Sequence, residues 1–392
     1  MDTPANPFRP AQRSGNVAAF LAMDVLSRAR ALEGEGRDIV HMEVGQPEAP
    51  VPEVVIAASR EKLETGVLSY TEALGTMAFR RAVRAHMKRW YSVDVPVERI
   101  VAITGSSGGF MLAFLACFNP RARVALPVPG YPAYRNTIAA LDLAPVLMPL
   151  DPATGFIPSL DDIAALHAKE PLDGLLLASP NNPTGTVIPR KRLGEIAAFC
   201  RANGIRLISD EIYHGLVYGT SAETALAFDP DAIVVNSLSK FFCMTGWRIG
   251  WMIVPEELVR PVERLQQNLF ICPPDISQAG AVAALENVDA FAPVLDRYRQ
   301  NRALFESLPS LGFGRVLPMD GAFYAYADIT PFGLDALTFT QRMLEEASVA
   351  ATPGLDFDPL TGGSYVRFSY AGAPERMGEG IERLKRWLSS LG

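Results

Sequence analysis

A lysine, two serines and an arginine occur together in one short segment of the chain. Residues 236–250 contain Ser237, Ser239, Lys240 and Arg248, directly after an apolar run. A free lysine with a pKa near 10.4 is about 0.1% neutral or less at pH 7, so a nucleophilic lysine needs its charge removed by imine formation or disfavoured by a neighbouring cation. Arg248 is a candidate for that cation. The segment indicates a site that anchors a cofactor, although a surface loop explains the same residues when each is taken alone.

A carboxylate and a phenol follow a second apolar run, residues 205–209. Asp210 stands where a parallel strand would end. A carboxylate about 4 Å from a heterocyclic cation gains roughly 4 kcal/mol at an effective dielectric of about 20, or about three pKa units. That energy would keep a pyridine nitrogen protonated at neutral pH, whereas the alternative for Asp210 is to cap the following helix. Tyr213 could reach the same ligand with its hydroxyl, and an ordinary half-buried tyrosine is the alternative.

Two turns that follow strands offer groups for an oxygen atom and for an anion. In residues 179–185, Asn182 offers its amide to a ligand oxygen while Pro183 fixes its direction. Residues 104–109, which include Ser106 and Ser107, precede an apolar helix, so free N–H groups would face a phosphate at that helix's N-terminus. The spacing matches neither the dinucleotide-binding fingerprint nor the P-loop. Each turn taken alone is a weak signal.

Three further residues gain meaning only beside the others. Tyr131 lies in a turn and could stack on a planar ring, although a core or loop aromatic is the default. Arg367 alternates with Tyr365 and Ser369 on one strand face and could pair with a carboxylate through two hydrogen bonds, or simply be solvated. Tyr70 precedes a helix and has no signal of its own.

Alternating strand and helix patterns must position these groups. Six apolar runs are typical of strands: residues 100–103, 123–126, 174–178, 205–208, 232–235 and 249–254. Between two of them, residues 190–203 carry apolar side chains at helical spacing, so this segment should be an amphipathic helix covering a sheet face. The βαβ order predicts a largely parallel sheet, and ligands of such sheets bind beyond the carboxyl ends of the strands.

The last third of the chain has a different character. It contains a helical run from about residue 278 to 308, strands near 323–327 and 365–370, and helices near 337–348 and from 377. We therefore predict a smaller α+β domain of residues 1–45 and 286–392.

The remaining residues, 46–285, are predicted to form a large domain, and the fold is predicted as α/β. Within the large domain, we expect the apolar helix that follows residues 104–109 to begin at Phe110.

Composition limits the possible classes of protein. The 392 residues are 49% hydrophobic and 20% charged, which suits one large or two moderate globular domains. The net charge of -7, without a Lys/Arg block, argues against a nucleic-acid partner. Four scattered cysteines fit a reducing compartment, and the four histidines lack metal-ligand spacing, so we expect no metal.

No apolar segment suggests a membrane partner. Residues 1–10 offer no core for a signal peptide, and the longest apolar run, residues 110–118, is too short to span a bilayer. We expect a cytoplasmic protein.

In order and spacing, the motifs resemble the class I/II pyridoxal phosphate (PLP)-dependent aminotransferases of fold type I, an aspartate aminotransferase-like group. The match runs from about Val17 to Ala371 and is carried by residues 45–47, Tyr70 with Gly75, 104–109, 129–131, 182–185, 210–213, 237–250 and Arg367. The combination is specific, because each of these motifs would otherwise have to occur by chance in the family's order and spacing.

The resemblance implies a role for each candidate residue. Lys240 would form an internal aldimine with pyridoxal 5′-phosphate and later move a proton between the substrate Cα and the cofactor C4′. Asp210 would pair with the pyridine nitrogen, Tyr213 and Asn182 would contact the 3′-oxygen, and Tyr131 would stack on the ring. The residues implied for the phosphate are Ser106, Ser107, Ser237, Ser239, Arg248 and, from the second subunit of a homodimer, Tyr70.

The substrate contacts follow from the same resemblance. Arg367 would grip the substrate α-carboxylate, assisted by Asn182 and the Gly45 backbone. Tyr131 stands where several relatives carry Trp, and Ser107 stands where some dicarboxylate-preferring relatives carry lysine, so a strong preference for aspartate is not expected.

The implied activity is a ping-pong exchange of an amino group between an amino acid and a 2-oxo acid. A PLP-dependent carbon–sulfur β-lyase on the same scaffold is an alternative that the sequence hardly separates. A PLP-binding transcriptional regulator is a more remote alternative, because it needs a DNA-binding segment, and the roughly 45 residues before the first strong motif contain no basic helix-turn-helix pattern.

Overall fold

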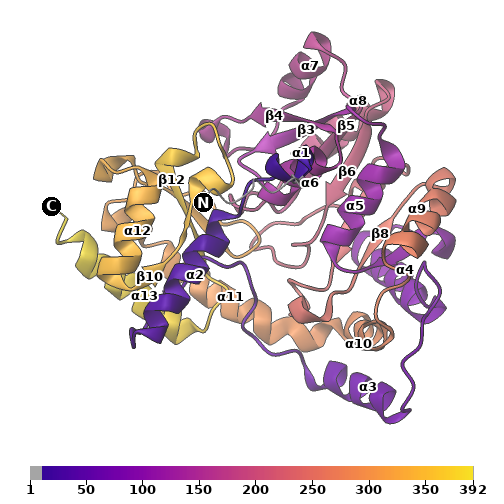
Figure 1. Ribbon diagram of the computed structural model, residues 1–392, viewed down its shortest axis with the longest axis horizontal. Coiled ribbons are helices and arrows are strands. Elements are labelled where there is room, and N and C mark those ends of the chain that lie inside the picture. Colours follow the sequence, from indigo (N-terminus) through magenta and orange to yellow (C-terminus); the bar gives the residue numbers. More distant parts are fainter. Residues whose placement is uncertain (1–10, 392) are drawn as a thin grey trace, which may run out of the picture.

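The computed structural model describes residues 11–391, and in this range the strands form three sheets (Figure 1). The strands are β1 (Val40–His41), β2 (Ile100–Ile103), β3 (Arg123–Val128), β4 (Ala144–Pro149), β5 (Gly174–Ala178), β6 (Arg206–Asp210), β7 (Ile233–Ser237), β8 (Gly250–Ile253), β9 (Tyr324–Asp328), β10 (Val349–Ala350), β11 (Thr352–Pro353) and β12 (Tyr365–Ser369). Seven of them form the central sheet in the order β2-β8-β7-β6-β5-β3-β4. Within it β8 is antiparallel to both neighbours, and the remaining pairs are parallel.

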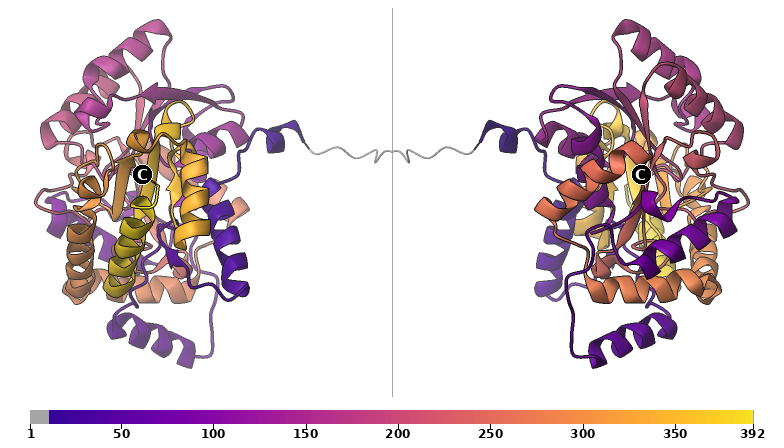
Figure 2. Two further views of the ribbon diagram at one scale, coloured as in Figure 1. Left: turned by 90° about the vertical axis from the view of Figure 1, so that its left-hand side faces the viewer. Right: turned by 90° about the vertical axis from the view of Figure 1, so that its right-hand side faces the viewer.

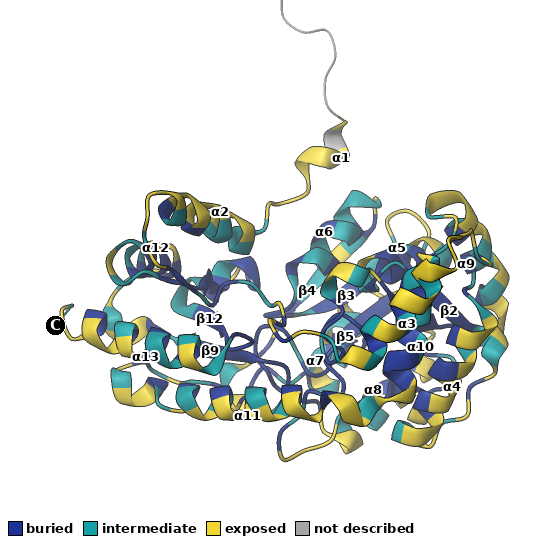
Figure 3. Ribbon diagram, turned by 90° about the horizontal axis from the view of Figure 1, so that it is seen from below, coloured by how far each residue is buried: buried dark blue, intermediate teal, exposed yellow. Residues whose placement is uncertain are grey.

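Helices cover both faces of this sheet, and α2, α12 and α13 pack against the smaller sheets. The helices are α1 (Gln12–Gly15), α2 (Leu21–Gly34), α3 (Glu53–Glu64), α4 (Met77–Tyr91), α5 (Ser106–Cys117), α6 (Pro132–Ala140), α7 (Leu160–Lys169), α8 (Arg190–Ala202), α9 (Glu256–Leu269), α10 (Asp275–Glu286), α11 (Ala292–Phe305), α12 (Ala336–Ala347) and α13 (Pro374–Leu388). In Figures 2 and 3, α1 lies at the periphery of the molecule, and it contacts α6. No helix within residues 11–391 is both long and apolar enough to cross a bilayer. Residues 1–10, for which we expect no signal peptide, lie outside the described part.

The central strands are buried on both faces, which explains their continuous apolar runs. In β7, Ile233 and Val235 pack in a cluster with α5, α6 and α9, while Val234 points to a second cluster with α4, α8 and α10. Figure 3 shows the central strands in the buried colour, whereas outer helices such as α3 turn exposed faces to solvent. The mostly parallel sheet flanked by helices confirms the predicted α/β fold.

Three local predictions need correction. The unpredicted strand β4 lies at the edge of the central sheet, where Pro145 and Pro149 are tolerated because an edge strand has unpaired backbone groups. The helical run expected from 278 to 308 is interrupted between α10 and α11, where Pro293 stands at the start of the second helix. The helix expected from Phe110 begins earlier, at Ser106.

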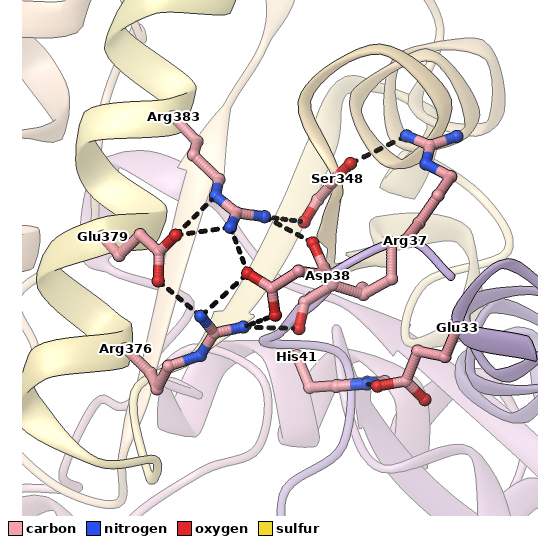
Figure 4. A network of polar contacts seen from close by, with 9 residues as sticks. Glu33, Arg37, Asp38, His41, Ser348, Arg376, Glu379 and Arg383 are labelled. Atoms are coloured by element: carbon pink, nitrogen blue, oxygen red, sulfur yellow. Dashed lines mark hydrogen bonds and ion pairs between the residues drawn. The ribbon is translucent and has the colours of Figure 1, made fainter. Parts of the chain in front are cut away.

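Both ends of the chain meet in the smaller sheets. The antiparallel sheet β11-β12-β9 lies within the last third of the chain, and the parallel pair β1–β10 joins the N-terminal segment to it. Figure 4 shows Asp38, just before β1, between Arg376 and Arg383 of α13. Hydrogen bonds from Arg376 and then Arg383 hold the pKa of the Asp38 carboxyl below its usual value. The N-terminal strand is thereby tied to the C-terminal helix.

Candidate active site

A cavity of about 280 Å³ opens at the carboxyl ends of the parallel strands, between the central sheet and the C-terminal sheet. Most of the predicted site residues line it: Gly45, Ser106, Ser107, Tyr131, Asn182, Asp210, Tyr213, Ser239, Lys240, Arg248 and Arg367. Two predicted residues, Ser237 and Tyr70, do not line it. The topology therefore brings together groups that are more than 300 residues apart in the chain.

Asp210 is the last residue of β6, and its carboxylate is buried and held from two sides. Its Oδ1 accepts a hydrogen bond from the Ile212 amide at 3.0 Å, and its Oδ2 accepts one from the Tyr134 hydroxyl. Burial raises the pKa of Asp210 to about 6, although Tyr134, Ile212 and the charge of Lys240 act in the opposite direction. A carboxylate so placed can stabilise a cationic ring nitrogen.

Tyr134 is a site residue that the sequence analysis missed. It stands three positions after Tyr131 at the start of α6, which places both rings on one side of the helix, with centroids 5.4 Å apart. This spacing is a signal that could have indicated a shared role.

Lys240 lies just after β7, with its Nζ donating a hydrogen bond to the Gly45 carbonyl oxygen at 2.6 Å. Burial, followed by the charges of Arg367 and Arg248, lowers the pKa of Lys240 to about 8, while Asp210 opposes the shift. At pH 7 about a tenth of such a lysine is neutral, against less than about a thousandth of a free lysine. The side chain is therefore prepared to act as a nucleophile and a base.

The N-terminus of α5 has the donors that an anion site requires. Gly105 precedes the helix with φ 76°, and the first backbone bond of the helix runs from Gly109 N to Gly105 O at 3.3 Å. Within the described residues, the amides of Ser106 and Ser107 have no acceptor. A Cβ at position 105 would lie 2.4 Å from Nη2 of Arg248, so glycine allows the guanidinium to lie at the helix N-terminus. Helix amides and a guanidinium together fit a phosphate.

The early start of α5 has a packing cause. A Cβ at Gly108 would lie 2.6 Å from Thr104 Oγ1, and one at Gly109 would lie 2.5 Å from Ile103 Cδ1. The two glycines therefore allow the first turn of the helix to pack against the end of β2. In the sequence Gly108 and Gly109 are typical of a loop, which explains why the helix was predicted to begin only at Phe110.

Ser237 and Ser239 differ in their positions. Ser239 lines the cavity, whereas Ser237 lies behind it, with its Oγ 2.9 Å from Ser239 Oγ. Ser237 Oγ also accepts a hydrogen bond from the Ser239 amide at 3.1 Å. Ser237 thus holds Ser239 in place. Tyr70 lies outside the cavity of its own chain, with 81% of its surface exposed.

Arg367 on β12 is buried and fixed. Its Nη1 donates to Asn182 Oδ1 at 3.0 Å and its Nη2 donates to the Glu43 carbonyl oxygen, while its Nε has no acceptor among the described residues. Its guanidinium lies 4.5 Å from the ring centroid of Tyr324 and 4.6 Å from that of Phe357. A rigid guanidinium with a free donor fits a carboxylate ligand.

The remaining wall of the cavity is largely apolar and was not predicted. Phe20, Ala22 and Met23, at the start of α2, line it. Asp356 holds this helix end by accepting hydrogen bonds from the Leu21 and Ala22 amides, each at 3.2 Å. Nothing in the local sequence places α2 over the cavity, because the contact depends on the packing of distant segments.

The groups present fit PLP. The donors at α5 could bind a phosphate, Asp210 could pair with a ring nitrogen, and Tyr131 could stack on the ring face. Tyr213 could donate to a ring oxygen, and Lys240 could react with the aldehyde carbon. Burial raises the pKa of the Asp210 carboxyl, and a pyridinium beside it would favour the charged carboxylate. Within residues 11–391, no group of His, Cys, Asp and Glu side chains is arranged to hold a metal ion.

Known proteins resemble this chain over nearly its full length. The family model for aminotransferase class I and II matches residues 37–384. A valine–pyruvate aminotransferase of Mycobacterium tuberculosis is 45% identical over 388 residues, which cover 97% of this chain and 99% of that protein. The crystal structure of an aminotransferase from M. tuberculosis has 44% identity and a TM-score of 0.94, covering 98% of this chain and 100% of the other. An aspartate aminotransferase from Thermus thermophilus, solved with maleate, has 28% identity and a TM-score of 0.91, covering 97% of this chain and 99% of the other.

Proposed function

The chain belongs to the class I and II aminotransferases, and we propose that it transfers the amino group of an apolar amino acid to a small 2-oxo acid such as pyruvate. The enzyme is a PLP-dependent aminotransferase. The observation that carries the choice of substrate is the cavity wall. The cations that line it are Lys240, Arg248 and Arg367, for which the resemblance implies the aldehyde, the phosphate and the α-carboxylate as partners. The rest of the wall has apolar side chains such as Phe20 and Met23 and two carboxylates, Glu43 and Asp356, so it offers no further cation for a second carboxylate of the substrate. The resemblance to a valine–pyruvate aminotransferase supports the same class of substrate.

The phosphate site is proposed at the N-terminus of α5. The Ser106 and Ser107 amides, the Ser239 hydroxyl and the Arg248 guanidinium would hold the phosphate, because several oriented donors and one cation suit a dianion. Ser237 acts behind them by holding Ser239.

The ring of the cofactor is proposed to lie between Tyr131 and the end of β6. Asp210 would hold the pyridine nitrogen in its protonated form, Tyr213 and Asn182 would donate to the 3′-oxygen, and Tyr131 would stack on the ring. When bound, PLP supplies the electron sink of the reaction, and the protein orients the bond that breaks.

Lys240 is the proposed acid and base. A lysine with its pKa lowered to about 8 can take a proton from the substrate Cα in its neutral form and return it in its charged form near neutral pH. Arg367, with Asn182 and Gly45 beside it, would bind the substrate α-carboxylate and so present the Cα proton to Nζ of Lys240.

The substrate proposal is tested by a donor screen. The holoenzyme is mixed with valine, leucine, alanine or aspartate, and the first half-reaction is followed by the visible absorbance of the cofactor. We expect valine to react with a higher kcat/KM than aspartate, because a second carboxylate would meet an apolar wall. A higher kcat/KM for aspartate would refute the proposed substrate class.

Release of pyruvate and ammonia from cysteine, without amino transfer to an acceptor, would instead favour a β-lyase. Adding cysteine to the screen, with an assay for pyruvate and ammonia, therefore tests both activities in one preparation.

We also propose a homodimer with Tyr70 completing the neighbouring site. Exposed apolar side chains occur in the segment before Tyr70 (Leu63, Val67 and Leu68) and in residues 269–271 (Leu269 and Ile271). The two segments involved are neighbours, since the Thr71 amide lies 3.4 Å from Cys272 Sγ. An apolar patch of this kind is typical of a subunit interface, and Arg248 is exposed in the single chain.

Mixed dimers test the shared site. Subunits with both Tyr70→Phe and Lys240→Ala are combined with wild-type subunits, so each hybrid retains one lysine-bearing site, which receives the altered Tyr70. We expect weaker PLP binding by these hybrids than by hybrids made with Lys240→Ala alone. A fully active monomer in sedimentation experiments would refute the proposal. The domain boundaries at 45/46 and 285/286 and the cytoplasmic location remain predictions.

A further inference from the structure

Tyr324 on β9 contacts three of the proposed site residues, although no motif in the sequence identifies it. Its hydroxyl lies 2.7 Å from the hydroxyl of Tyr213, and its ring centroid lies 4.5 Å from the Arg367 guanidinium carbon. The side chain is 1% exposed and lines the cavity. One residue therefore touches both the proposed ligand of the cofactor oxygen and the proposed ligand of the substrate carboxylate.

Gly45 is the third contact. A Cβ at position 45 would lie 1.9 Å from Oη of Tyr324 and 2.8 Å from its Cζ, so only glycine fits beside this hydroxyl. The Gly45 carbonyl oxygen is also the acceptor of Lys240 Nζ. Tyr324 thus limits where the backbone that faces Lys240 can lie.

We propose that Tyr324 is a positioning residue that directs the Tyr213 hydroxyl toward the cofactor and holds the Arg367 guanidinium in place for the substrate carboxylate. The inference rests on the proposed roles of Tyr213 and Arg367 and adds a residue on which both depend. Tyr324 acts through these two side chains, and its two contacts use different parts of the side chain, the hydroxyl for Tyr213 and the ring for Arg367.

The hydroxyl contact has a definite direction once a ligand oxygen is present. Tyr213 has one O–H, so when it donates to the ligand it must accept from Tyr324. Burial raises the pKa of both phenols above the usual value, so both remain protonated. A hydroxyl that accepts a hydrogen bond becomes a stronger donor, and Tyr324 therefore strengthens the bond from Tyr213 to the ligand oxygen.

The ring contact restrains Arg367. The guanidinium is held between the rings of Tyr324 and Phe357, with centroid distances of 4.5 and 4.6 Å. The contact is a cation–π interaction in a buried site, where such contacts are strongest. It leaves the edge of the guanidinium for hydrogen bonding.

Two substitutions separate the contacts. Tyr324→Phe keeps the ring and removes the hydroxyl, whereas Tyr324→Leu removes both. Tyr326→Phe is the matched control, because Tyr326 lies on the same strand, is equally buried, and has a hydroxyl without a partner among residues 11–391. The control should leave every measured quantity unchanged.

The first measurement is the pH dependence of the visible absorbance of the holoenzyme, which reports the proton near the ring oxygen and the Lys240 nitrogen. In Tyr324→Phe the ligand oxygen receives a weaker hydrogen bond and holds its proton more strongly. We expect the midpoint to rise by roughly 0.5 pH unit. KM for valine should remain within about twofold of the wild-type value, because the ring still faces Arg367.

The second measurement separates the ring contact. Tyr324→Leu should show the same rise in midpoint and, in addition, an increase in KM for valine of about tenfold, with a smaller change in kcat. Thermal unfolding of each holoenzyme identifies a variant that is merely unstable.

A pairwise test addresses the fit beside Gly45. Gly45→Ala should impair cofactor binding in the wild-type background and less so combined with Tyr324→Phe, which removes the 1.9 Å contact. An absorbance midpoint in Tyr324→Phe equal to that of wild type would overturn the role toward Tyr213, and an unchanged KM in Tyr324→Leu would overturn the role toward Arg367. A wild-type protein without a pH-dependent absorbance would instead contradict the proposed function itself.

Discussion

The substitution Asp210→Asn removes a charge while leaving the shape of the site intact. The Ile212 amide requires an oxygen acceptor and holds Oδ1 at 3.0 Å, so the new amide nitrogen would face the Tyr134 hydroxyl. A hydroxyl both donates and accepts, so Tyr134 can reverse its role and accept a hydrogen bond from the amide. The variant is therefore expected to fold and to keep the cavity.

The charge itself has a large effect. A carboxylate about 4 Å from a cation gains roughly 4 kcal/mol at an effective dielectric of about 20, which corresponds to about three pKa units. Burial raises the pKa of Asp210 to about 6, so the side chain is mostly ionised at pH 7 even before a cationic partner stabilises the charge. Loss of this energy should slow the half-reaction by about a hundredfold to a thousandfold.

A single-turnover experiment measures the effect. The holoenzyme is mixed with excess valine, and the decay of the cofactor absorbance gives the rate of the first half-reaction. Affinity for the cofactor should change much less, because the phosphate site at α5 does not involve Asp210.

Tyr134→Phe is the control, since it removes one hydrogen bond to Asp210 and keeps the charge. It should slow the reaction by about tenfold or less. Half-reaction rates of Asp210→Asn within twofold of wild type would refute the proposed electrostatic role.

Three further predictions concern the same site. Lys240→Ala should abolish turnover and still bind PLP, because Arg248 and α5 hold the phosphate; borohydride reduction of the wild type should place the pyridoxyl mass on the peptide that contains Lys240, and a label elsewhere would contradict the assignment. Burial raises the pKa of Glu211 to about 8 from 4.5 in the unfolded chain, so the folded protein keeps a proton that the unfolded chain loses. The free energy of unfolding of the apoprotein should therefore fall between pH 4.5 and 8 by about 1.4 kcal/mol per pH unit relative to Glu211→Gln, as measured with urea; equal slopes would show that Glu211 is ionised throughout. Ser237→Ala should weaken PLP binding less than Ser239→Ala, because Ser237 lies behind the cavity; equilibrium binding compares them, and the reverse order would contradict the supporting role.

The local sequence predicted the elements that carry their own signal. The six apolar runs form strands of the central sheet because strands buried on both faces need continuous apolar residues. The edge strand β4 escaped prediction because its prolines are tolerated only where a neighbour is missing. The start of α5 was misplaced because its glycines are required by packing against Ile103 and Thr104, which no local pattern reveals.

For the candidate site, the sequence determined which chemical groups are present. Lys240 and Asp210 are indicated by the apolar strands that precede them and by the spacing of their neighbours. The tertiary structure alone decided the environment of these groups. Tyr134 contacts Asp210, and Tyr324 contacts Tyr213, only because α6 and β9 pack around the cavity. The shift of the Lys240 pKa to about 8 likewise depends on burial and on Arg367, which is distant in the chain. Such effects arise from distances between side chains that only the packing of separate elements sets, so they have no counterpart in the order of residues.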